Sequence, residues 1–425
     1  MIPEAPAPAV AATAPARRLR LAVAASHPVQ YQAPWYRALS SLVDVKVFFA
    51  HRMTPDDHAG AGFGIGFEWD TPILDGYDFQ WLENVAPAPG VDRFRGCNTP
   101  GIRMELEKGA FDALVVNGWH LLSYWQAIRA ARRAGIPVLA RGDSQLVPAR
   151  SRVRRIVKRA TYPRLLRSFD VCLAVGQRNA DYYRAYGVPP DRIGCSPHCV
   201  DNAFFMRATD TARRHAADLR HGLGIPEGSV VFVFVGKLIG KKRPMDFLKA
   251  LDSVRQRRSN VWGVIVGDGP LRARIEAHRT RHGTPCTMSG FLNQRQIARA
   301  YAAADALVLP STGEETWGLV VNEAMASGIP AIVSDQVGCA PDLIVEGETG
   351  FTYPCGDAEA LADRIARMAA DARLRTAMGA GAAGRIAAFS PEAAAAGVVR
   401  AVERLRSAPG HRNEREGRHV VDAVS

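Results

Sequence analysis

Short runs of apolar, mostly β-branched residues alternate with longer stretches of helical periodicity from residue 19 to about residue 355. Apolar strands separated by helices are typical of βαβ units and of parallel sheets that are covered on both faces. In the first half of the chain the pattern predicts strands at Leu19–Ala25, Val43–Phe49, Ala113–Asn117, Pro137–Ala140, Val171–Val175 and Arg192–Cys195. In the second half it predicts strands at Val230–Val235, Trp262–Val266, Thr287–Gly290, Ala306–Leu309, Ala331–Val333 and Gly350–Tyr353. Because so many strands exceed one compact sheet, we expect an α/β protein with two doubly wound domains.

A charged stretch between Asp201 and Glu227 separates the two series of strands. We therefore expect one domain over residues 19–205 and a second over residues 206–388, followed by a final helix over 389–406 that begins at Ser390–Pro391. The Ala/Pro-rich residues 1–18 are expected to form a disordered arm, and the polar residues 407–425 a flexible tail. In sheets of this kind the ligand binds at the carboxyl ends of the strands, so the site is expected between the two domains.

Composition indicates the class of protein but does not indicate one function. Of 425 residues, 47% are hydrophobic and 23% are charged, which is typical of a globular protein. Lys and Arg number 54 against 42 Asp and Glu, and the formal net charge of +12 indicates attraction to phosphates, nucleic acid or an acidic membrane surface. The odd number of cysteines, seven, favours free thiols in a reducing compartment, and no apolar run reaches the ~18 residues of a membrane span. A cytoplasmic protein is therefore expected.

The segment from Leu309 to Asp335 carries the strongest chemical signal. A predicted strand ends at Leu309, a loop follows, and a helix is expected from about Gly318 to Ser327. The first backbone N–H groups of such a helix, at Gly318, Leu319 and Val320, have no acceptor within the helix, and the helix dipole favours an anion beside them. A diphosphate fits that position.

Two carboxylates flank this predicted helix start. Glu323, in the second turn, can accept both hydroxyl groups of a ribose, as carboxylates do in nucleotide sites. Glu315, in the loop, is expected on the other side of the phosphates, where a transferred group would lie. The alternative for Glu315 is a loop charge stabilised by the helix dipole.

The two carboxylates resemble the E-x7-E signature of the retaining family 4 glycosyltransferases, which Glu315-Thr-Trp-Gly-Leu-Val-Val-Asn-Glu323 satisfies. The likeness covers roughly residues 19–400 and extends to Val235-Gly-Lys-Leu, Lys241-Lys-Arg-Pro, Val266-Gly-Asp-Gly-Pro and Ser289-Gly-Phe. It implies the GT-B fold, in which two Rossmann-like doubly wound domains face each other across a cleft and a last helix crosses back.

The resemblance also assigns roles. It implies that Glu323 holds the donor ribose and that Glu315, the expected catalytic residue, contacts the donor sugar. Lys237, where the family usually has arginine, and Lys242 would neutralise the donor diphosphate. The residues themselves support this role, because fixed cations and helix N–H groups stabilise the negative charge of a departing nucleoside diphosphate. The alternative for Lys241–Arg243 is a solvated turn.

The first half of the chain departs from the common family pattern. Ser26-His-Pro-Val-Gln-Tyr31 replaces the usual Gly-Gly loop, and His27 either lines the acceptor side or is a loop histidine. Asn117 aligns with a histidine of the family and His120 follows three residues later, so either side chain could contact the donor sugar. Gly60–Asp70 is interpreted as a loop over the cleft that shapes acceptor binding, or as a surface excursion, and Arg141–Ser144 as a turn.

No metal and no cofactor is expected beyond the nucleotide-sugar substrate. The chain lacks an Asp-x-Asp pair, the pattern with which other glycosyltransferases hold a divalent ion. The cluster of Cys195, His198 and Cys199 has no second pair of ligands at zinc-site spacing.

Arg150–Arg167 holds eight basic residues and no acidic one. A thin apolar stripe at helical spacing, Val153, Ile156, Val157 and Ala160, faces away from most of these charges. Such a basic amphipathic helix can lie on an anionic membrane surface; alternatively, its stripe packs on the domain and its arginines point into water.

Together these observations predict a retaining, metal-independent glycosyltransferase of the hexosyl or a related type. It would move a sugar from a nucleoside-diphosphate sugar to a saccharide or lipid-linked saccharide, in cell-surface polysaccharide or glycolipid synthesis, in the cytoplasm or peripherally on the inner membrane face. The alternative is a donor-site protein without turnover that acts as a partner in a polymer-synthesis complex. Specific nucleic-acid binding is not expected, because the chain has no recognisable reading helix and no aromatic-basic RNA signature.

Overall fold

Two parallel sheets, one in each half of the chain, organise the protein. The computed structural model describes residues 18–60, 65–146, 152–258 and 260–407, and side chains at 152–155 are not described. The expected arm and tail therefore lie outside the described residues, except for Arg18 and Ser407.

The first sheet has seven strands in the order β3-β2-β1-β4-β5-β6-β7, and every pairing is parallel. Its strands are β1 (Arg20–Ala25), β2 (Asp44–Phe49), β3 (Asp78–Trp81), β4 (Ala113–Val116), β5 (Val138–Gly142), β6 (Val171–Ala174) and β7 (Ile193–Cys195). The sequence predicted all of these except β3. This strand lies at the edge of the sheet and is at least partly exposed at each of its four positions, so it lacks the buried apolar run that marked the others.

The second sheet has six parallel strands in the order β10-β9-β8-β11-β12-β13. They are β8 (Val230–Val235), β9 (Val261–Val266), β10 (Cys286–Gly290), β11 (Ala306–Leu309), β12 (Ala331–Ser334) and β13 (Gly350–Tyr353), each within one residue of its predicted limits. The strand order reverses direction between β1 and β4 in the first sheet and between β8 and β11 in the second. Ligands of doubly wound sheets bind beside such switch points.

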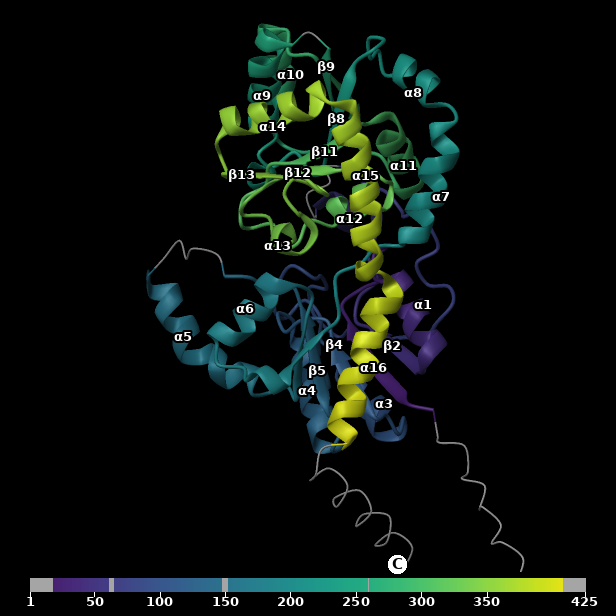
Figure 1. The fold of residues 1–425 in the computed structure, drawn as a ribbon. Helices are drawn as coiled ribbons and strands as arrows, with labels where there is room; N and C mark the ends of the chain where they lie inside the picture. Colours follow the sequence, from purple (N-terminus) through teal and green to yellow (C-terminus); the bar gives the residue numbers. More distant parts are fainter. Residues whose placement is uncertain (1–17, 61–64, 147–151, 259, 408–425) are drawn as a thin grey trace, which may run out of the picture.

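Each sheet is covered by helices on both faces. Around the first sheet lie α1 (Ala33–Leu42), α2 (Pro55–His58), α3 (Ile102–Lys108), α4 (Leu122–Arg133), α5 (Arg152–Leu166) and α6 (Gln177–Ala185). Around the second lie α7 (Asn202–Arg213), α8 (Ala216–Gly222), α9 (Pro244–Arg257), α10 (Arg272–His282), α11 (Gln294–Ala303), α12 (Leu319–Ala326), α13 (Ala340–Leu343), α14 (Ala358–Ala370) and α15 (Ala372–Ile386). We call the two bodies, one above the other in Figure 1, the first lobe and the second lobe.

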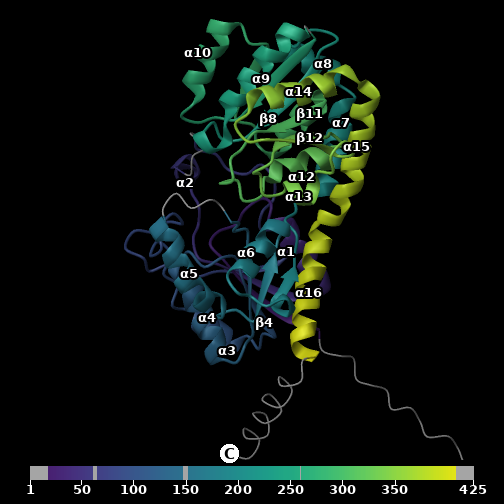
Figure 2. The ribbon, with the colours of Figure 1, turned by 60° about the vertical axis from the view of Figure 1, so that its left-hand side comes forward.

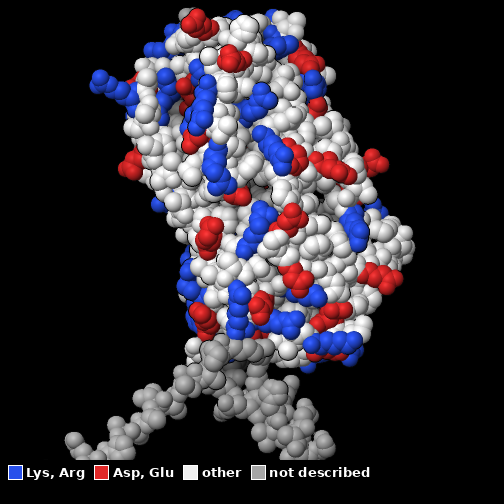
Figure 3. Space-filling model, turned by 90° about the vertical axis from the view of Figure 1, so that its right-hand side faces the viewer, with Lys and Arg blue, Asp and Glu red and all other residues white. Residues whose placement is uncertain are grey.

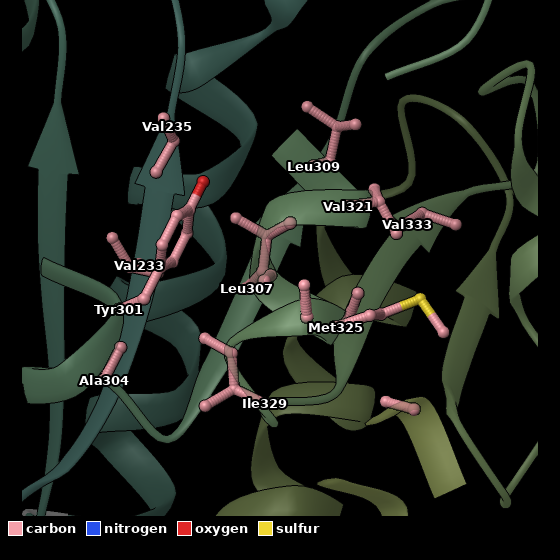
Figure 4. Close-up of a cluster of buried hydrophobic side chains, with 14 of the residues drawn as sticks. Val233, Val235, Tyr301, Ala304, Leu307, Leu309, Val321, Met325, Ile329 and Val333 are labelled. Carbon is pink, nitrogen blue, oxygen red and sulfur yellow. The ribbon is translucent and has the colours of Figure 1, made fainter. Parts of the chain in front are cut away.

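Side chains along the central strands point alternately to the two faces of the sheet, so each lobe has two buried clusters, one on each face. In β8, Val231, Val233 and Val235 belong to one buried cluster, whereas Phe232 and Phe234 belong to another on the opposite face. Figure 4 shows the first of these clusters, where β8 and β11 pack against side chains of α11 and α12. Two-sided burial explains why the strands appear in the sequence as continuous apolar runs rather than as alternating ones.

The chain crosses from the second lobe back to the first through α15 and the last helix, α16 (Pro391–Ser407), which lies along the first lobe (Figures 1 and 2). Ser390 caps α16 as predicted, since its hydroxyl oxygen accepts from the Ala393 N–H at 3.2 Å. The helix packs on α1, and Val398 and Val402 join the core of the first lobe. At Gly397 a Cβ atom would lie 1.9 Å from the Cys195 carbonyl oxygen, so the close approach of α16 to β7 requires glycine.

The expected division between residues 205 and 206 falls inside α7. This helix starts at Asn202, is capped by the Asp201 carboxylate through the Phe204 N–H, and contacts α11 and α12. The two lobes therefore meet in sequence just before α7.

Candidate functional site

Two glycine turns shape the space at the carboxyl end of β8. Gly236 follows β8 with φ +153°, and Gly267 follows β9 with φ +134°. A Cβ atom on Gly267 would lie 2.0 Å from the Gly236 carbonyl oxygen, so a side chain here would push the two turns apart. Glycine at both positions lets the backbone turn sharply away and leaves room above the strand ends.

A cavity of about 460 Å³, which we call the β8 cavity, occupies that room. Its lining combines the turn after β8, the turn after β9, the start of α12, the β10–α11 connection and two residues of the first lobe. The lining residues are Val235, Gly236, Lys237, Ile239, Lys241, Lys242, Val266, Gly267, Asp268, Phe291, Leu292, Gln294, Ile297, Val320, Glu323, Gln30 and Trp69. Of the predicted donor residues, Lys237, Lys242, Val320 and Glu323 thus line one cavity.

Glu323 is held by a buried tyrosine. The Tyr301 hydroxyl donates to Glu323 Oε2 at 2.7 Å, and the tyrosine ring is fully buried in the cluster of Figure 4. Burial raises the pKa of Glu323 to about 7, although the Tyr301 hydrogen bond and the charge of Lys242 favour the ionised form. The carboxyl group therefore changes charge near neutral pH.

Glu315 forms an ion pair with Lys242, and both side chains are almost covered, at 13% and 11% exposure. Glu315 does not line the β8 cavity itself but lies at its edge through this pair. The pKa of Lys237 is lowered, first by burial and then by the charges of Lys241 and Lys242. Three ammonium groups beside one paired carboxylate leave this end of the cavity with excess positive charge.

Gly318 sets the start of α12. It takes φ +103°, and a Cβ atom there would lie 2.8 Å from Leu309 Cδ2, so both conformation and space demand glycine. The helix begins at Leu319, as expected, and Val320 in its first turn reaches the β8 cavity. Of the three residues predicted at this helix start, Val320 lines the same cavity as the lysines, whereas Gly318 and Leu319 do not. A helix start and ammonium groups both favour an anion.

A second cavity of about 330 Å³, the β1 cavity, lies in the first lobe at the carboxyl ends of β1, β4 and β5. The three predicted acceptor or sugar residues, His27, Asn117 and His120, all line it. Burial, followed by the nearby His51 and His58, lowers the pKa of His27 to about 4, and burial also lowers the pKa of His120. His27 is therefore neutral at physiological pH, with Nδ1 3.0 Å from Ser26 Oγ.

The segment after β5 ties the two lobes together at the Glu315 loop. Asp143 accepts a hydrogen bond from the Thr316 hydroxyl at 2.6 Å, and the Gln145 side-chain amide donates to the carbonyl oxygens of Gly313 and Glu315. The sequence interpreted Arg141–Ser144 as a turn and did not single out Gln145. No local signal could have found them, because their partners lie 168 to 173 positions away.

The aromatic loop Gly60–Asp70, which was expected to shape acceptor binding, reaches the β8 cavity. Residues 61–64 of this loop lie outside the described residues. Trp69 lines the β8 cavity and not the β1 cavity, and Phe67 packs on Phe291 of the second lobe with ring centroids 4.5 Å apart. The described part of this loop therefore lies beside the β8 cavity, and its role in acceptor binding stays a prediction.

The basic segment forms α5 at the side of the first lobe (Figure 2). Arg150 lies outside the described residues, and the Val153 side chain is not described. Ile156 and Val157 are 66% and 53% exposed, beside exposed Lys158 and Arg159. This described part of the apolar stripe therefore does not pack on the domain.

Charged side chains of both signs are mixed on one face of the molecule (Figure 3). On the face in Figure 3, which covers only part of the surface, basic and acidic side chains are interspersed. No helix among the described residues is both long and apolar enough to cross a membrane. Within the same described ranges, no group of three or more His, Cys, Asp or Glu side chains is placed to hold a metal ion.

Comparisons with known proteins match both halves of the chain. Residues 36–204 match the family described as Glycosyltransferase Family 4, and residues 216–385 match the family described as Glycosyl transferases group 1. A D-inositol 3-phosphate glycosyltransferase of Corynebacterium glutamicum is 32% identical over 66% of this chain and 67% of its own length. A sulfoquinovosyl transferase of Arabidopsis thaliana is 35% identical, over 38% of this chain and 30% of its own length. The chain thus spans 67% of the length of the first of these curated relatives and 30% of the length of the second.

Among solved structures, HepE of Anabaena in complex with UDP and glucose superimposes with a TM-score of 0.68. It covers 92% of this chain and all of its own, at 16% identity. At that identity the likeness concerns the fold, two Rossmann-like domains of the GT-B type.

Proposed function

Because the chain belongs to glycosyltransferase family 4, we propose that it transfers a sugar from a nucleoside-diphosphate sugar to a saccharide or lipid-linked saccharide acceptor. The observation that carries the proposal is the β8 cavity, in which ammonium groups, a helix start and the carboxyl of Glu323 line one space. That set matches the parts of a nucleoside diphosphate: two phosphates and a ribose with two hydroxyl groups. HepE, which has the same fold, was solved with UDP and glucose.

Each group has a proposed role. Lys237 and Lys242, with the first amides of α12, hold the diphosphate. Glu323 accepts hydrogen bonds from the ribose hydroxyls. Glu315 contacts hydroxyl groups of the donor sugar, and its ion pair with Lys242 links the sugar and phosphate ends of the donor.

The proposed reaction breaks the bond between the anomeric carbon and the phosphate oxygen, and the bonding electrons leave with the nucleoside diphosphate. Fixed positive charge beside that oxygen lowers the barrier because it is already in place as the negative charge develops. Lysines and helix amides supply such charge without a divalent ion, so we propose metal-independent transfer. Retention of the anomeric configuration is proposed from family membership.

The β1 cavity is the proposed acceptor site. His27, Asn117 and His120 offer neutral hydrogen-bonding groups, which suit hydroxyl groups of a saccharide. The acceptor oxygen bonds to the anomeric carbon as the donor bond breaks, and its proton passes to the phosphate oxygen that leaves with the bonding electrons.

For the acceptor class we propose a lipid-linked saccharide at an anionic membrane surface. Support comes from α5, where exposed Ile156 and Val157 lie beside Lys158 and Arg159. Apolar side chains flanked by cations bind the boundary of an anionic bilayer. The product would then belong to cell-surface polysaccharide or glycolipid synthesis, on the inner face of the membrane.

A panel of nucleotide sugars tests the proposal. The wild-type protein should be stabilised against heat by one class of nucleoside diphosphate and should turn over the matching sugar in the presence of a chelator. Glu315→Ala and Lys242→Met should reduce kcat/KM at least tenfold, whereas Lys249→Met, an equal charge change at an exposed position of α9, should not. Nuclear magnetic resonance of the product reports the anomeric configuration.

Normal turnover in both Glu315→Ala and Glu323→Ala would overturn the assignment. Nucleoside-diphosphate binding without turnover on any acceptor would favour the alternative of a binding partner in a polymer-synthesis complex.

A further inference from the structure

A segment of the first lobe is bound to the second lobe beside the β8 cavity. We call residues 65–72, which follow α2, the strap. Asn293 Nδ2 donates to the Glu68 carbonyl oxygen at 2.7 Å, and the Thr71 hydroxyl donates to Gln294 Oε1 at 2.7 Å. The Asp70 carboxylate accepts from the Arg295 N–H at 3.1 and 3.2 Å, which places a negative charge at the start of α11.

Aromatic rings from both lobes fix the centre of the strap. His58 stacks on Phe67 with centroids 4.6 Å apart, and Phe67 meets the edge of Trp69 at 4.8 Å and packs on Phe291 at 4.5 Å. His58 is buried, and its Nδ1 is 2.8 Å from the Phe67 carbonyl oxygen. Trp69 is therefore held by Phe67, which itself packs on Phe291 across the lobe boundary.

Trp69 lines the β8 cavity together with Phe291, Leu292 and Ile297. The remaining lining consists largely of the lysine turn, the glycine turns and Glu323, which suit the phosphates and the ribose. These four side chains form an apolar, aromatic wall of the cavity. The base is the flat and weakly hydrated part of a nucleoside diphosphate, and it fits this wall. Aromatic side chains bind bases by stacking, at about 1–3 kcal/mol for each base.

We propose that Trp69 is a base-binding residue of the donor site, supplied by the first lobe across the lobe boundary. The strap closes the base end of the β8 cavity, and the indole ring stacks on the nucleobase of the donor. The inference rests on the proposed function and deepens it: the two lobes share the donor site. Donor binding therefore favours the arrangement in which the strap is bound to α11.

Isothermal titration of the full-length protein with UDP, ADP, GDP and inorganic pyrophosphate tests the proposal. Trp69→Ala should weaken binding of the nucleoside diphosphate that the wild type prefers by about 5- to 140-fold, which is the stacking contribution converted at tenfold for every 1.4 kcal/mol. Its affinity for pyrophosphate should stay within twofold of wild type. Trp69→Phe should recover most of the loss, and Phe94→Ala, at an exposed ring of the same lobe, should have no effect.

Asp70→Ala provides a second variant in case Trp69→Ala folds poorly. This substitution removes the carboxylate from the start of α11 and leaves the residues that line the cavity unchanged. It should also weaken binding of the nucleoside diphosphate but not binding of pyrophosphate. Unchanged nucleoside-diphosphate affinity in both variants, or an equal loss for pyrophosphate, would overturn the role of Trp69 and leave the proposed function intact. A wild-type protein that binds none of the three nucleotides would overturn the proposed function as well.

Discussion

Gln145 of the first lobe donates its side-chain amide to the carbonyl oxygen of Glu315 in the second lobe, at 3.1 Å. The same amide donates to the Gly313 carbonyl oxygen at 2.6 Å, and Gln145 is 8% exposed. The loop that carries the expected catalytic carboxylate is thus positioned from the opposite lobe.

Gln145→Ala should therefore lower kcat by about tenfold, because two hydrogen bonds of about 0.5–1.5 kcal/mol each no longer hold the loop. The dissociation constant of the nucleoside diphosphate should change less than twofold, since Gln145 does not line the β8 cavity. Steady-state kinetics and titration separate the two effects. Gln177→Ala, whose exposed side chain bonds only to its own helix, is the control, and an equal loss there would contradict the role of Gln145.

The raised pKa of Glu323 predicts opposite pH trends for binding and stability. The group holds its proton up to about pH 7 in the folded chain, against an ordinary value of 4.5. Between these values the folded state binds more protons than the unfolded state, so its stability falls as pH rises, by on the order of 3 kcal/mol from this group alone. Nucleoside-diphosphate affinity should rise over the same range, because the ionised carboxylate accepts the ribose hydroxyls.

Glu323→Gln should remove both trends. Thermal unfolding at pH 5 and pH 8 should show the variant gaining stability relative to wild type at the higher pH. Titration should show weaker nucleotide binding that no longer depends on pH near 7. Parallel pH profiles for variant and wild type would contradict the raised pKa.

Gly318→Ala should destabilise the second lobe by about 1–3 kcal/mol, because the residue would keep a left-handed conformation and its Cβ would lie 2.8 Å from Leu309 Cδ2. Gly384→Ala is the matched control. Gly384 lies exposed within α15 with nothing near its Cβ position, so alanine there should be neutral or stabilise the helix by up to about 1 kcal/mol. Denaturant unfolding measures both, and equal effects would argue against the strain at Gly318.

The exposed stripe on α5 predicts binding to anionic membranes. Replacing Ile156 and Val157 by serine should reduce cosedimentation with vesicles of anionic phospholipid by more than tenfold, because two exposed apolar side chains are lost. Met206→Ser, which removes a similarly exposed side chain from α7, should leave it unchanged. Binding of wild-type protein to neutral vesicles as strong as to anionic ones would contradict the contribution of Lys158 and Arg159.

The sequence predicted the fold, and it proposed residues of the candidate site that lie close together along the chain, because both depend on neighbours in sequence. Twelve of the strands follow from apolar runs, which two-sided burial imposes on each strand separately. Glu315 and Glu323 are eight positions apart around one helix start, so their proximity is decided locally. The edge strand β3 escaped detection because partial exposure removes the apolar run.

By itself, then, the sequence determined two parallel sheets, the glycine and lysine turns and the carboxylates around α12, since each arises from backbone preferences and burial within a short segment. Only the tertiary structure decided that Tyr301 bears on the charge of Glu323, that Gln145 holds the Glu315 loop, and that Trp69 reaches the β8 cavity. These relationships join side chains 22 and 170 positions apart, or segments of different lobes. The packing of whole elements sets such distances, and no periodicity or spacing along the chain records them.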